Sequence, residues 1–540
     1  MNVGNSNVPA DQQGIGESAL RAVPLLIDLE QALLRTDPLA EAALAYVAAN
    51  PLRIAYPLAG WAWRGRATIE KNLLEAVEPD PELMPVSEEI IELAAAAKRE
   101  GRQVFLVTDK DELLARELCL RIPYFTDVIC CSGAKTDSPK STVIVERFPD
   151  GYDYVGGRAT DPEIWRNARE ALVVAPTKTV LQSIEAHDKP TTVIPRRSRL
   201  SALIKASRLH QLAKNALIFV PAILSGTIVD PATLISCLLA FLALGLVAMG
   251  TYLINDLLDI AHDRRHWSKR FRPIASGDLP IGTALAAALA SIAGGFAIAS
   301  TVGLGVLAGL GAYLVLTLAY SMHLKRVPIL DVTVLATLFT LRLAIGIAAA
   351  GVFASPWLLV FSMALFTSLS IAKRNTEIQR TAIKGETEVA GRGYVTADAP
   401  LVLGLGLATG TASVVILVLF LIFDALERDI YTNPHWLWLF PIIIFLWLGR
   451  IWLVSQRGEL NDDPVAFAIK DRQSLALGAV MAAAFFLAGL GVPLWAPLKR
   501  ASSSRICPRR PDFSWPAAQR PCSTGSCVFR YHSSCRSRPR

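Results

Sequence analysis

The alternation of hydrophobic and polar positions divides the chain into two main parts. In the first, apolar runs of strand length, such as VPLLID at 23–28 and VFLVTD at 104–109, alternate with helical stretches. Strands that alternate with helices predict a doubly wound α/β domain, here over residues 22–185. In the second part, from 214 to 498, long apolar segments follow one another with short polar breaks.

Nine segments of the second part approach the roughly 20 residues needed to cross a bilayer. They predict an all-α membrane bundle of nine transmembrane helices, at about 215–232, 234–254, 281–299, 302–320, 328–350, 355–372, 400–423, 436–453 and 474–495. The loops on one side hold 16 Lys and Arg, whereas the opposite loops hold one, Arg428. Because positive charge marks the cytoplasmic side, we expect a multi-pass protein of a bacterial-type inner (plasma) membrane. Its N-terminal domain and active site are expected to be cytoplasmic.

Composition and charge narrow the function classes. The chain is 52% hydrophobic and only 19% charged, which excludes a wholly soluble enzyme and a disordered scaffold. The net charge of +7 would suggest nucleic acid, but residues 499–540 alone contribute +9 and leave −2 for the rest. We therefore expect no nucleic-acid partner, and we predict that this basic tail is a disordered extension.

Two shorter segments flank the α/β domain. Residues 1–21 form a polar N-terminal extension without the apolar core of a signal peptide. Residues 186–213 form a basic linker in which arginines and lysines alternate with apolar residues. Such a pattern predicts an interfacial helix that leads into the first span.

The end of the second span carries an acidic cluster, NDLLDIAHD, with Asn255, Asp256, Asp259 and Asp263. If the helix continues, the three aspartates share one face. Carboxylates so close repel one another unless a cation is present, and Mg²⁺ suits oxygen ligands that it shares with substrate phosphates. Basic residues that suit phosphates follow at once: Lys269, Arg270 and Arg272. The alternative is a solvated acidic helix end followed by a basic membrane anchor.

Polar chemistry gathers in the inner loops rather than along the spans. This favours an enzyme that joins a water-soluble substrate to a lipid over a channel or a transporter. Arg342 is the exception, because it lies well inside the fifth span. An arginine at that depth is costly unless it is paired or lines a polar cavity, so Arg342 is either a site residue or a structurally paired one.

Several motifs resemble the UbiA superfamily of intramembrane prenyltransferases. They are NDLLDIAHD at 255–263, KRFRPIASGDLP at 269–280, YSMHLKRVPILDV at 320–332 and FTLRLAIG at 339–346. The resemblance implies that Asp256, Asp259 and Asp263 bind Mg²⁺ and the diphosphate of a donor, with Asn255 supporting the diphosphate.

One departure from the family pattern concerns the segment after the sixth span. Where ordinary members have a second aspartate-rich motif, this chain reads AKRNTEIQRTAIKGE at 372–386. With GRGY at 391–394, this resembles the polyprenyl-phosphate phosphoribosyltransferase branch. That resemblance implies transfer of 5-phosphoribosyl from phosphoribosyl diphosphate to a polyprenyl phosphate, towards arabinosyl lipid donors for glycoconjugates. The rival is aromatic prenyl transfer from a polyprenyl diphosphate, which the missing acidic motif disfavours. A homo-oligomer is left open.

The branch suggests a role for each basic residue. Lys373, Arg374, Arg380 and Lys384 are candidates for the 5-phosphate of the donor, and Glu377 for a further metal ligand. The acceptor phosphate is assigned to Lys325, Arg326 and Arg342.

The α/β domain resembles the haloacid dehalogenase (HAD) phosphatase superfamily. Asp28 stands at the position of the nucleophile, and Thr108 stands in the hydroxyl motif. However, Glu30 replaces the expected second aspartate, and at the metal motif Gly157 replaces a ligand while Asp161 remains. We therefore predict a catalytically degenerate domain. The alternative is a phosphatase that removes the 5-phosphate from the membrane domain's product.

Overall fold

The computed structural model describes most of the chain. The described residues are 23–49, 80–109, 112–131, 140–157, 162–176, 178–185, 190–389, 391–426, 431–460, 467–468 and 470–490. The predictions for residues 1–21 and for the tail at 499–540 lie outside them.

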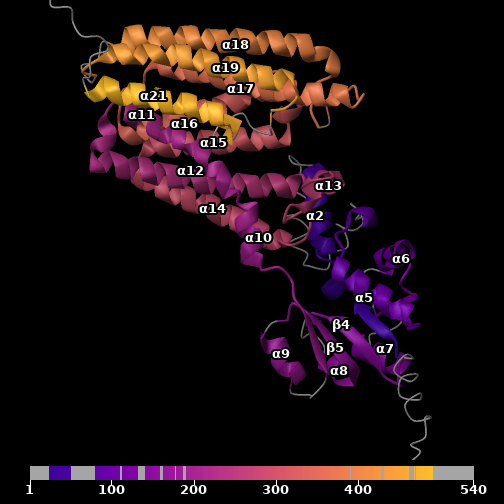
Figure 1. Ribbon diagram of the computed structural model, residues 1–540. Coiled ribbons are helices and arrows are strands. Elements are labelled where there is room, and N and C mark those ends of the chain that lie inside the picture. The colour runs from indigo at the N-terminus through magenta and orange to yellow at the C-terminus, as the bar shows by residue number, and fades with distance from the viewer. Residues whose placement is uncertain are drawn as a thin grey trace, which may run out of the picture. The chain divides into compact units, whose positions relative to one another are not determined.

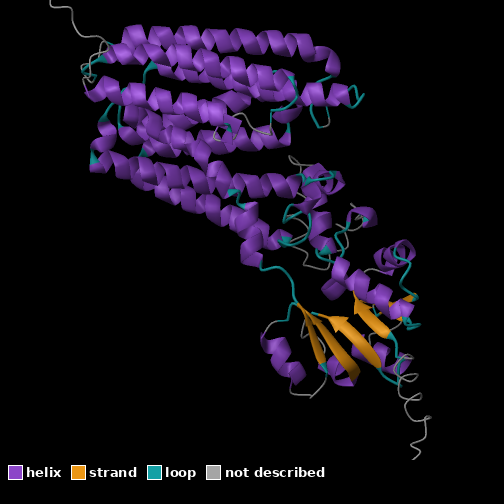
Figure 2. Ribbon diagram, viewed as in Figure 1, coloured by secondary structure: helices purple, strands orange, loops and turns teal. Residues whose placement is uncertain are grey.

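A six-stranded parallel sheet forms the centre of the N-terminal domain (Figure 2). Its order is β3-β2-β1-β4-β5-β6. The strands are β1 (Leu25–Asp28), β2 (Val104–Thr108), β3 (Asp127–Cys130), β4 (Tyr152–Gly156), β5 (Ala168–Val174) and β6 (Thr191–Ile194). The predicted parallel α/β domain is therefore confirmed. β6 lies beyond the predicted boundary at 185, in the segment expected to be a linker.

Helices cover both faces of this sheet. They are the π-helix η1 (Leu29–Leu33), η2 (Pro81–Leu83), α5 (Glu88–Arg99), α6 (Glu112–Arg121), α7 (Lys140–Arg147), α8 (Pro162–Asn167) and α9 (Lys178–Glu185). The helix α2 (Pro38–Ala49) packs instead against α12 (Pro231–Leu258), where Leu44 joins a cluster with Leu253 and Leu257. Successive strand side chains point to opposite faces, so Ile27 packs in one core with α5 and α6. Leu26 packs in the other core with α7, α8 and α9. The domain is thus a three-layer α/β/α structure.

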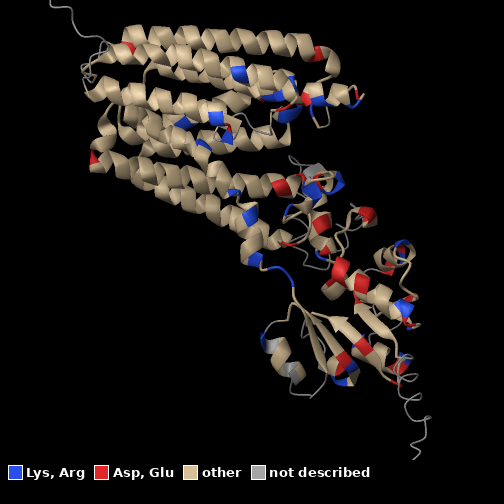
Figure 3. Cartoon of the chain, viewed as in Figure 1, with Lys and Arg blue, Asp and Glu red and all other residues tan. Residues whose placement is uncertain are grey.

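Eight helices of the second part are long and apolar enough to cross a membrane. They are α12 (Pro231–Leu258), α14 (Ile281–Val302), α15 (Leu304–Met322), α16 (Leu330–Ala350), α17 (Pro356–Ile383), α18 (Ala399–Phe420), α19 (Leu439–Gln456) and α21 (Arg472–Leu490). Short helical segments extend two of them: the 3₁₀ helix η7 (Thr396–Asp398) and the π-helix η8 (Leu421–Ala425) flank α18, and the 3₁₀ helix η9 (Pro434–Trp438) precedes α19. Charged residues are sparse along these helices (Figure 3). The chain is a multi-pass helical membrane protein (Figure 1).

The first predicted span has a different form. Residues 209–229 form the 3₁₀ helix η3 (Leu209–Phe219), α11 (Val220–Leu224) and the short η4 (Thr227–Val229). A 3₁₀ helix rises about 2.0 Å per residue, so η3 and α11 together are roughly 30 Å long, about the thickness of the hydrocarbon core. The segment starts at Arg208, which contacts Asp256 at the far end of α12, and it leads to Asp230, which caps the start of α12. A ninth crossing stays a prediction.

Small residues allow helices of the second part to approach one another closely. A Cβ atom added to Gly346 in α16 would lie 2.2 Å from the carbonyl oxygen of Ile218 in η3. A Cβ atom at Gly295 in α14 would lie 2.7 Å from the carbonyl oxygen of Ala243 in α12. Close backbone approach at small residues is typical of helices packed within a membrane.

The predicted interfacial helix of the linker is α10 (Arg199–Ala206). Its buried residues Ala202 and Ala206 share a cluster with Leu253 and Leu257, near the C-terminal end of α12. α10 therefore rests on the end of α12 that carries the predicted aspartates.

Candidate active site

The acidic motif forms a bend rather than one continuous helix. α12 ends at Leu258, Asp259 has φ −94° and ψ 8°, and the short α13 runs over Ile260–Arg265. The expectation of an unbroken helix is therefore corrected. Hydrogen bonds of helical spacing still connect the two pieces, because the Asp263 amide donates to the carbonyl oxygen of Asp259 at 2.8 Å. The three aspartates thus lie on successive turns.

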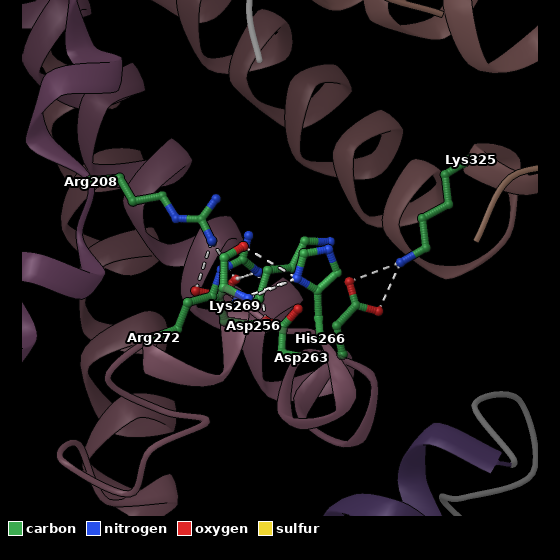
Figure 4. A network of polar contacts seen from close by, with 9 residues as sticks. Arg208, Asp256, Asp263, His266, Lys269, Arg272 and Lys325 are labelled. Atoms are coloured by element: carbon green, nitrogen blue, oxygen red, sulfur yellow. Dashed lines mark hydrogen bonds and ion pairs between the residues drawn. The ribbon is translucent and has the colours of Figure 1, made fainter. Parts of the chain in front are cut away.

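Asp256 and Asp263 share one cationic partner (Figure 4). Arg272 donates through Nη1 to Asp256 Oδ1 at 3.2 Å and to Asp263 Oδ2 at 2.6 Å. Arg208 donates through Nη2 to both carboxylate oxygens of Asp256, at 2.6 and 2.9 Å. Both aspartates are buried, with 3% and 2% exposure. Burial raises the pKa of Asp263, whereas Arg272 opposes the shift and the nearby Asp256 adds to it.

Asp259 turns toward a different loop. Both of its carboxylate oxygens accept hydrogen bonds from Lys325 Nζ, at 2.8 and 3.0 Å. Lys325 lies in η6 (Leu324–Arg326), the turn between α15 and α16. The structure therefore brings Lys325, predicted for the acceptor phosphate, next to the acidic motif. The neighbouring Arg326 is exposed.

The donor atoms of the acidic motif suit a hard cation. Carboxylate oxygens of Asp256 and Asp263 converge on one position, and the guanidinium of Arg272 fills it. Among the described residues, no group of three or more Asp, Glu, His or Cys side chains lies close enough to hold a metal ion. In donor chemistry the pair fits Mg²⁺, which is bound through one or two carboxylates together with substrate phosphates. Asn255, which precedes the pair, is half-buried.

A second ionic cluster surrounds Arg374 in α17. Arg374 Nε donates to Asp331 Oδ2 at 2.6 Å, and its Nη1 donates to Glu377 Oε2 at 2.5 Å. Its Nη2 also reaches the hydroxyl of Tyr320 at 3.3 Å. The side chain of Arg374 is 2% exposed and that of Asp331 is fully buried. Arg374 and Glu377 therefore pair with each other, although the sequence suggested separate roles for them.

The other predicted phosphate ligands lie in more open surroundings. Arg380 donates to the carbonyl oxygens of Gly458 and Leu460, at 2.9 and 3.0 Å, and so holds the segment that follows α19. Lys384 is exposed and directly follows the last residue of α17. The remaining candidates are half-buried (Lys373 and Lys269) or exposed (Arg270).

Arg342 is surrounded by neutral partners inside the bundle. It donates to Asn215 Oδ1 at 3.1 Å, to the Leu338 carbonyl oxygen at 2.5 Å and to the Tyr313 hydroxyl at 3.2 Å. Its guanidinium also lies over the rings of Tyr313 and Phe339. These contacts favour the structural alternative for Arg342 over a direct role with the acceptor.

The structure gives contacts to three residues for which the sequence suggested no individual role, although Arg208 belongs to the entry segment RLHQLAKNALIFVP at 208–221, which also resembles the UbiA pattern. Arg208 holds Asp256, and Arg392 of the GRGY segment donates to the Tyr320 hydroxyl and to the Lys325 carbonyl oxygen, at 2.9 and 3.2 Å. Tyr394 of the same segment donates to Asp331 Oδ1 at 2.7 Å. The GRGY motif was the available signal for the last two, but only the fold shows what they contact.

An apolar cavity of about 320 Å³ lies beside the GRGY segment, between α16, α17 and α18. Val332, Ile371, Leu401 and Leu405 line it, and Tyr394 forms part of its wall. It thus adjoins the Asp331–Arg374 pair through Tyr394.

The N-terminal domain also contains a buried polar cluster. Asp28, at the C-terminal end of β1, accepts hydrogen bonds at Oδ2 from Lys140 Nζ (2.6 Å) and from the Tyr154 hydroxyl (2.7 Å). The Thr108 hydroxyl donates to Glu30 Oε1 at 2.5 Å. Burial raises the pKa of Glu30 to about 7. Three of these residues, Asp28, Glu30 and Thr108, were predicted together, whereas Lys140 was missed.

The metal motif of this domain is only partly described. Asp161 lies outside the described residues. A Cβ atom at Gly157 would lie 2.9 Å from the Val174 carbonyl oxygen and 3.1 Å from that of Gln31. A carboxylate at that position would require the backbone to move. The identity of this domain as HAD-like stays a prediction.

Comparisons with known proteins identify the family of this chain. The model of the UbiA prenyltransferase family matches residues 216–470. The uncharacterized protein y4nM of Sinorhizobium fredii is 37% identical over 472 residues, which cover 87% of this chain and 91% of that protein. The nodulation protein NoeC of Azorhizobium caulinodans is 32% identical over 288 residues, or 52% of this chain and 92% of that protein.

A third relative is named for its activity. The decaprenyl-phosphate phosphoribosyltransferase of Corynebacterium glutamicum is 33% identical over 228 residues, or 41% of this chain and 66% of that protein. The family match spans the acidic motif, the Arg374 cluster and the GRGY segment. The chain therefore belongs to the UbiA prenyltransferase family, and it is a transferase of the membrane.

Proposed function

We propose that the protein transfers 5-phosphoribosyl from phosphoribosyl diphosphate to a polyprenyl phosphate, in a reaction that depends on Mg²⁺. The main support is the geometry of the acidic motif. The buried carboxylates of Asp256 and Asp263 converge on one position suited to a cation, and basic side chains surround that position. Such a site suits a donor with several phosphates. Support comes from the relative named as a decaprenyl-phosphate phosphoribosyltransferase. An aromatic prenyltransferase remains the alternative.

The chain's own residues would bind and orient the two substrates. When bound, Mg²⁺ would be held by Asp256 and Asp263 and would neutralise charge on the leaving diphosphate. Arg208 and Arg272 lie at those carboxylates and are placed to bind diphosphate oxygens. Lys325 would align the acceptor phosphate, which is already an anion and needs no strong base. Lys373 stays a candidate for the 5-phosphate, and Arg392, which donates to the Lys325 carbonyl oxygen, is a further one.

The lipid acceptor has a matching apolar surface. The cavity of about 320 Å³ beside Tyr394 is lined by aliphatic side chains and adjoins the GRGY segment. A polyprenyl chain can enter such a cavity from the membrane while its phosphate stays at the polar face. We place this face at the cytoplasmic side of a bacterial inner membrane, because the basic loops lie there. The product would supply arabinosyl donors for glycoconjugates.

A radiochemical assay tests this function. Membranes that contain the protein are incubated with labelled phosphoribosyl diphosphate and polyprenyl phosphate, with Mg²⁺ or with a chelator. We expect a labelled lipid only with Mg²⁺. A parallel reaction with polyprenyl diphosphate and an aromatic acceptor tests the alternative. A prenylated aromatic product, without any labelled phosphoribosyl lipid, would replace our proposal by that alternative.

A second activity is favoured by the cluster in the N-terminal domain. Asp28 is paired with Lys140. Glu30, whose pKa is raised to about 7, accepts a hydrogen bond from the Thr108 hydroxyl. A carboxylic acid of that pKa can donate a proton near neutrality. This domain would then remove the 5-phosphate from the lipid product. The tight surroundings of Gly157 favour the degenerate domain instead.

The phosphatase is tested on the full-length protein with the labelled lipid as substrate. If Glu30 is the acid, it is protonated below about pH 7, so phosphate release should fall as the pH rises through 7. Asp28→Asn should remove the release without affecting the first transfer. Equal release from the wild type and from Asp28→Asn would leave the domain without this activity.

A further inference from the structure

The short helix that carries Asp263 is held by a residue of the N-terminal part. Arg264 follows Asp263 in α13 and donates through Nη1 and Nη2 to the two carboxylate oxygens of Glu41, at 3.0 and 2.6 Å. Glu41 lies in the first turn of α2. The two side chains are 8% and 9% exposed. A guanidinium that donates two parallel hydrogen bonds to one carboxylate fixes the relative orientation of the two groups as well as their distance. This pair therefore determines the rotation of α13 about its axis.

Each member of this pair is also anchored to its own part of the chain. The Thr36 hydroxyl donates to Glu41 Oε1 at 2.6 Å. Arg264 Nε donates to the carbonyl oxygen of Ala275 at 2.9 Å. Because Ala275 lies three residues after Arg272, the guanidinium that binds Glu41 also closes the loop on which Arg272 stands.

A second contact lies farther along the same loop. Gly277 has φ +75°, and a Cβ atom there would lie 2.6 Å from Arg35 Cβ and 2.9 Å from the Arg35 carbonyl oxygen. Asp278 accepts from Arg35 and from Arg197, each at 3.4 Å. Asp278 is largely buried, but at 3.4 Å these two ion pairs are long and each contributes little alone. Together with the buried pair, however, they fix the loop 260–279 at two separate points.

The geometry of α13 links this contact to the acidic motif. Successive residues of a helix point about 100° apart, so Asp263 reaches Arg272 while Arg264 reaches Glu41. A rotation of α13 that loosened the Glu41 pair would therefore also displace Asp263 from the position it shares with Asp256.

We propose that the N-terminal domain sets the geometry of the acidic loop, with Glu41 as a positioning residue of the transferase. This rests on the proposed function, because it assigns Glu41 to the same site. The match to y4nM covers 472 residues, which is more than the membrane part alone contains. The match to NoeC covers 288 residues and 92% of that protein, so NoeC is too short to contain both parts. A contact such as that between Glu41 and Arg264 requires both parts in one chain.

Hydrogen exchange of the full-length protein in detergent tests the docking without relying on activity. In Glu41→Gln, we expect amides of 260–279 to exchange about tenfold faster, while those of 365–383 in α17 do not change. Glu112→Gln is the matched control, because Glu112 lies in the same domain and pairs with the exposed Arg116. Thermal unfolding confirms that each variant is folded, and the milder Glu41→Asp serves if Glu41→Gln is not. Unchanged exchange in a folded Glu41 variant would overturn the proposal.

Kinetics then separate positioning from mere support. A displacement of about 1 Å can cost up to about a hundredfold in rate, so we expect Glu41→Gln to raise the KM of the donor about tenfold and to leave the KM of the acceptor unchanged. The reversed pair, Glu41→Arg with Arg264→Glu, should restore part of this loss. An unchanged donor KM in the presence of faster exchange would refute the positioning role. If the wild type transfers no phosphoribosyl, the proposed function fails, and the exchange result still decides the docking.

Discussion

Substitution of Asp256 by Asn is expected to abolish phosphoribosyl transfer in a protein that remains folded. Asp256 is 3% exposed, and its carboxylate accepts hydrogen bonds from both Arg208 and Arg272. Asn has the same shape but no charge. The substitution therefore removes one of the two carboxylate charges that would bind a cation, and it leaves the guanidiniums of Arg208 and Arg272 without that counter-charge. Removal of a single group that stabilises developing charge commonly costs about 10²–10³ in rate, and we expect at least that loss. Initial rates in membranes with equal amounts of protein measure it.

Asp230 provides the matched control for this experiment. It caps the opposite end of the same helix, α12, where its side chain accepts from the Thr233 amide. Asp230→Asn should keep the transfer rate, because Asn also caps helices well. Full activity in Asp256→Asn would refute the assignment of the acidic motif, whereas a loss in both variants would indicate general damage to α12.

Substitution of Asp331 by Asn should cause the largest loss of stability. Asp331 has no exposed surface, and it accepts from Arg374 Nε at 2.6 Å and from the Tyr394 hydroxyl at 2.7 Å. Loss of one partner of a buried ion pair costs about 3–5 kcal/mol when the remaining charge is left alone; because Arg374 keeps Glu377, we expect a loss at the lower end, about 3 kcal/mol. The free energy of unfolding in detergent should fall by about that amount. Thermal or denaturant unfolding of the purified protein measures it.

Glu377 serves as a comparison that distinguishes the effect of burial from the effect of charge in this cluster. It contacts the same guanidinium, at 2.5 Å, but its side chain is 30% exposed. Water can replace part of its contact, so Glu377→Gln should cost only about 1 kcal/mol. If the two variants lost equal stability, the buried contact to Asp331 would have no special weight.

The alternation of strands and helices was predictable because buried parallel strands read as short apolar runs. β6 was missed because its sequence, TTVI, is half polar and largely exposed at the edge of the sheet. The first membrane segment was expected as an ordinary span, since apolar character does not distinguish a 3₁₀ helix from an α-helix. The close contact of this segment with α16, at Gly346 and Ile218, is a feature of the packed fold that apolar character does not reveal.

The candidate site was predictable to the extent that its chemistry is local in sequence. The aspartates of the acidic motif stand within eight residues of one another, and their spacing alone predicted that they act together. Their partners come from distant segments: Arg208 precedes α12, Lys325 follows α15, and Glu41 binds the neighbouring Arg264 from more than 200 residues away. Only the packed fold brings such residues together.

The position of Arg272 between Asp256 and Asp263 makes the site charge-balanced before any substrate arrives. Under the proposed function, a cation held by Asp256 and Asp263 would take the position that the guanidinium of Arg272 occupies here. The released guanidinium is then available to an anion. By thermodynamic linkage, a divalent cation and a diphosphate should each raise the affinity of the other. The protein would therefore bind its donor best as the complex of the diphosphate with the divalent cation. Between turnovers, Arg272 would be the counter-ion that keeps Asp256 and Asp263 together.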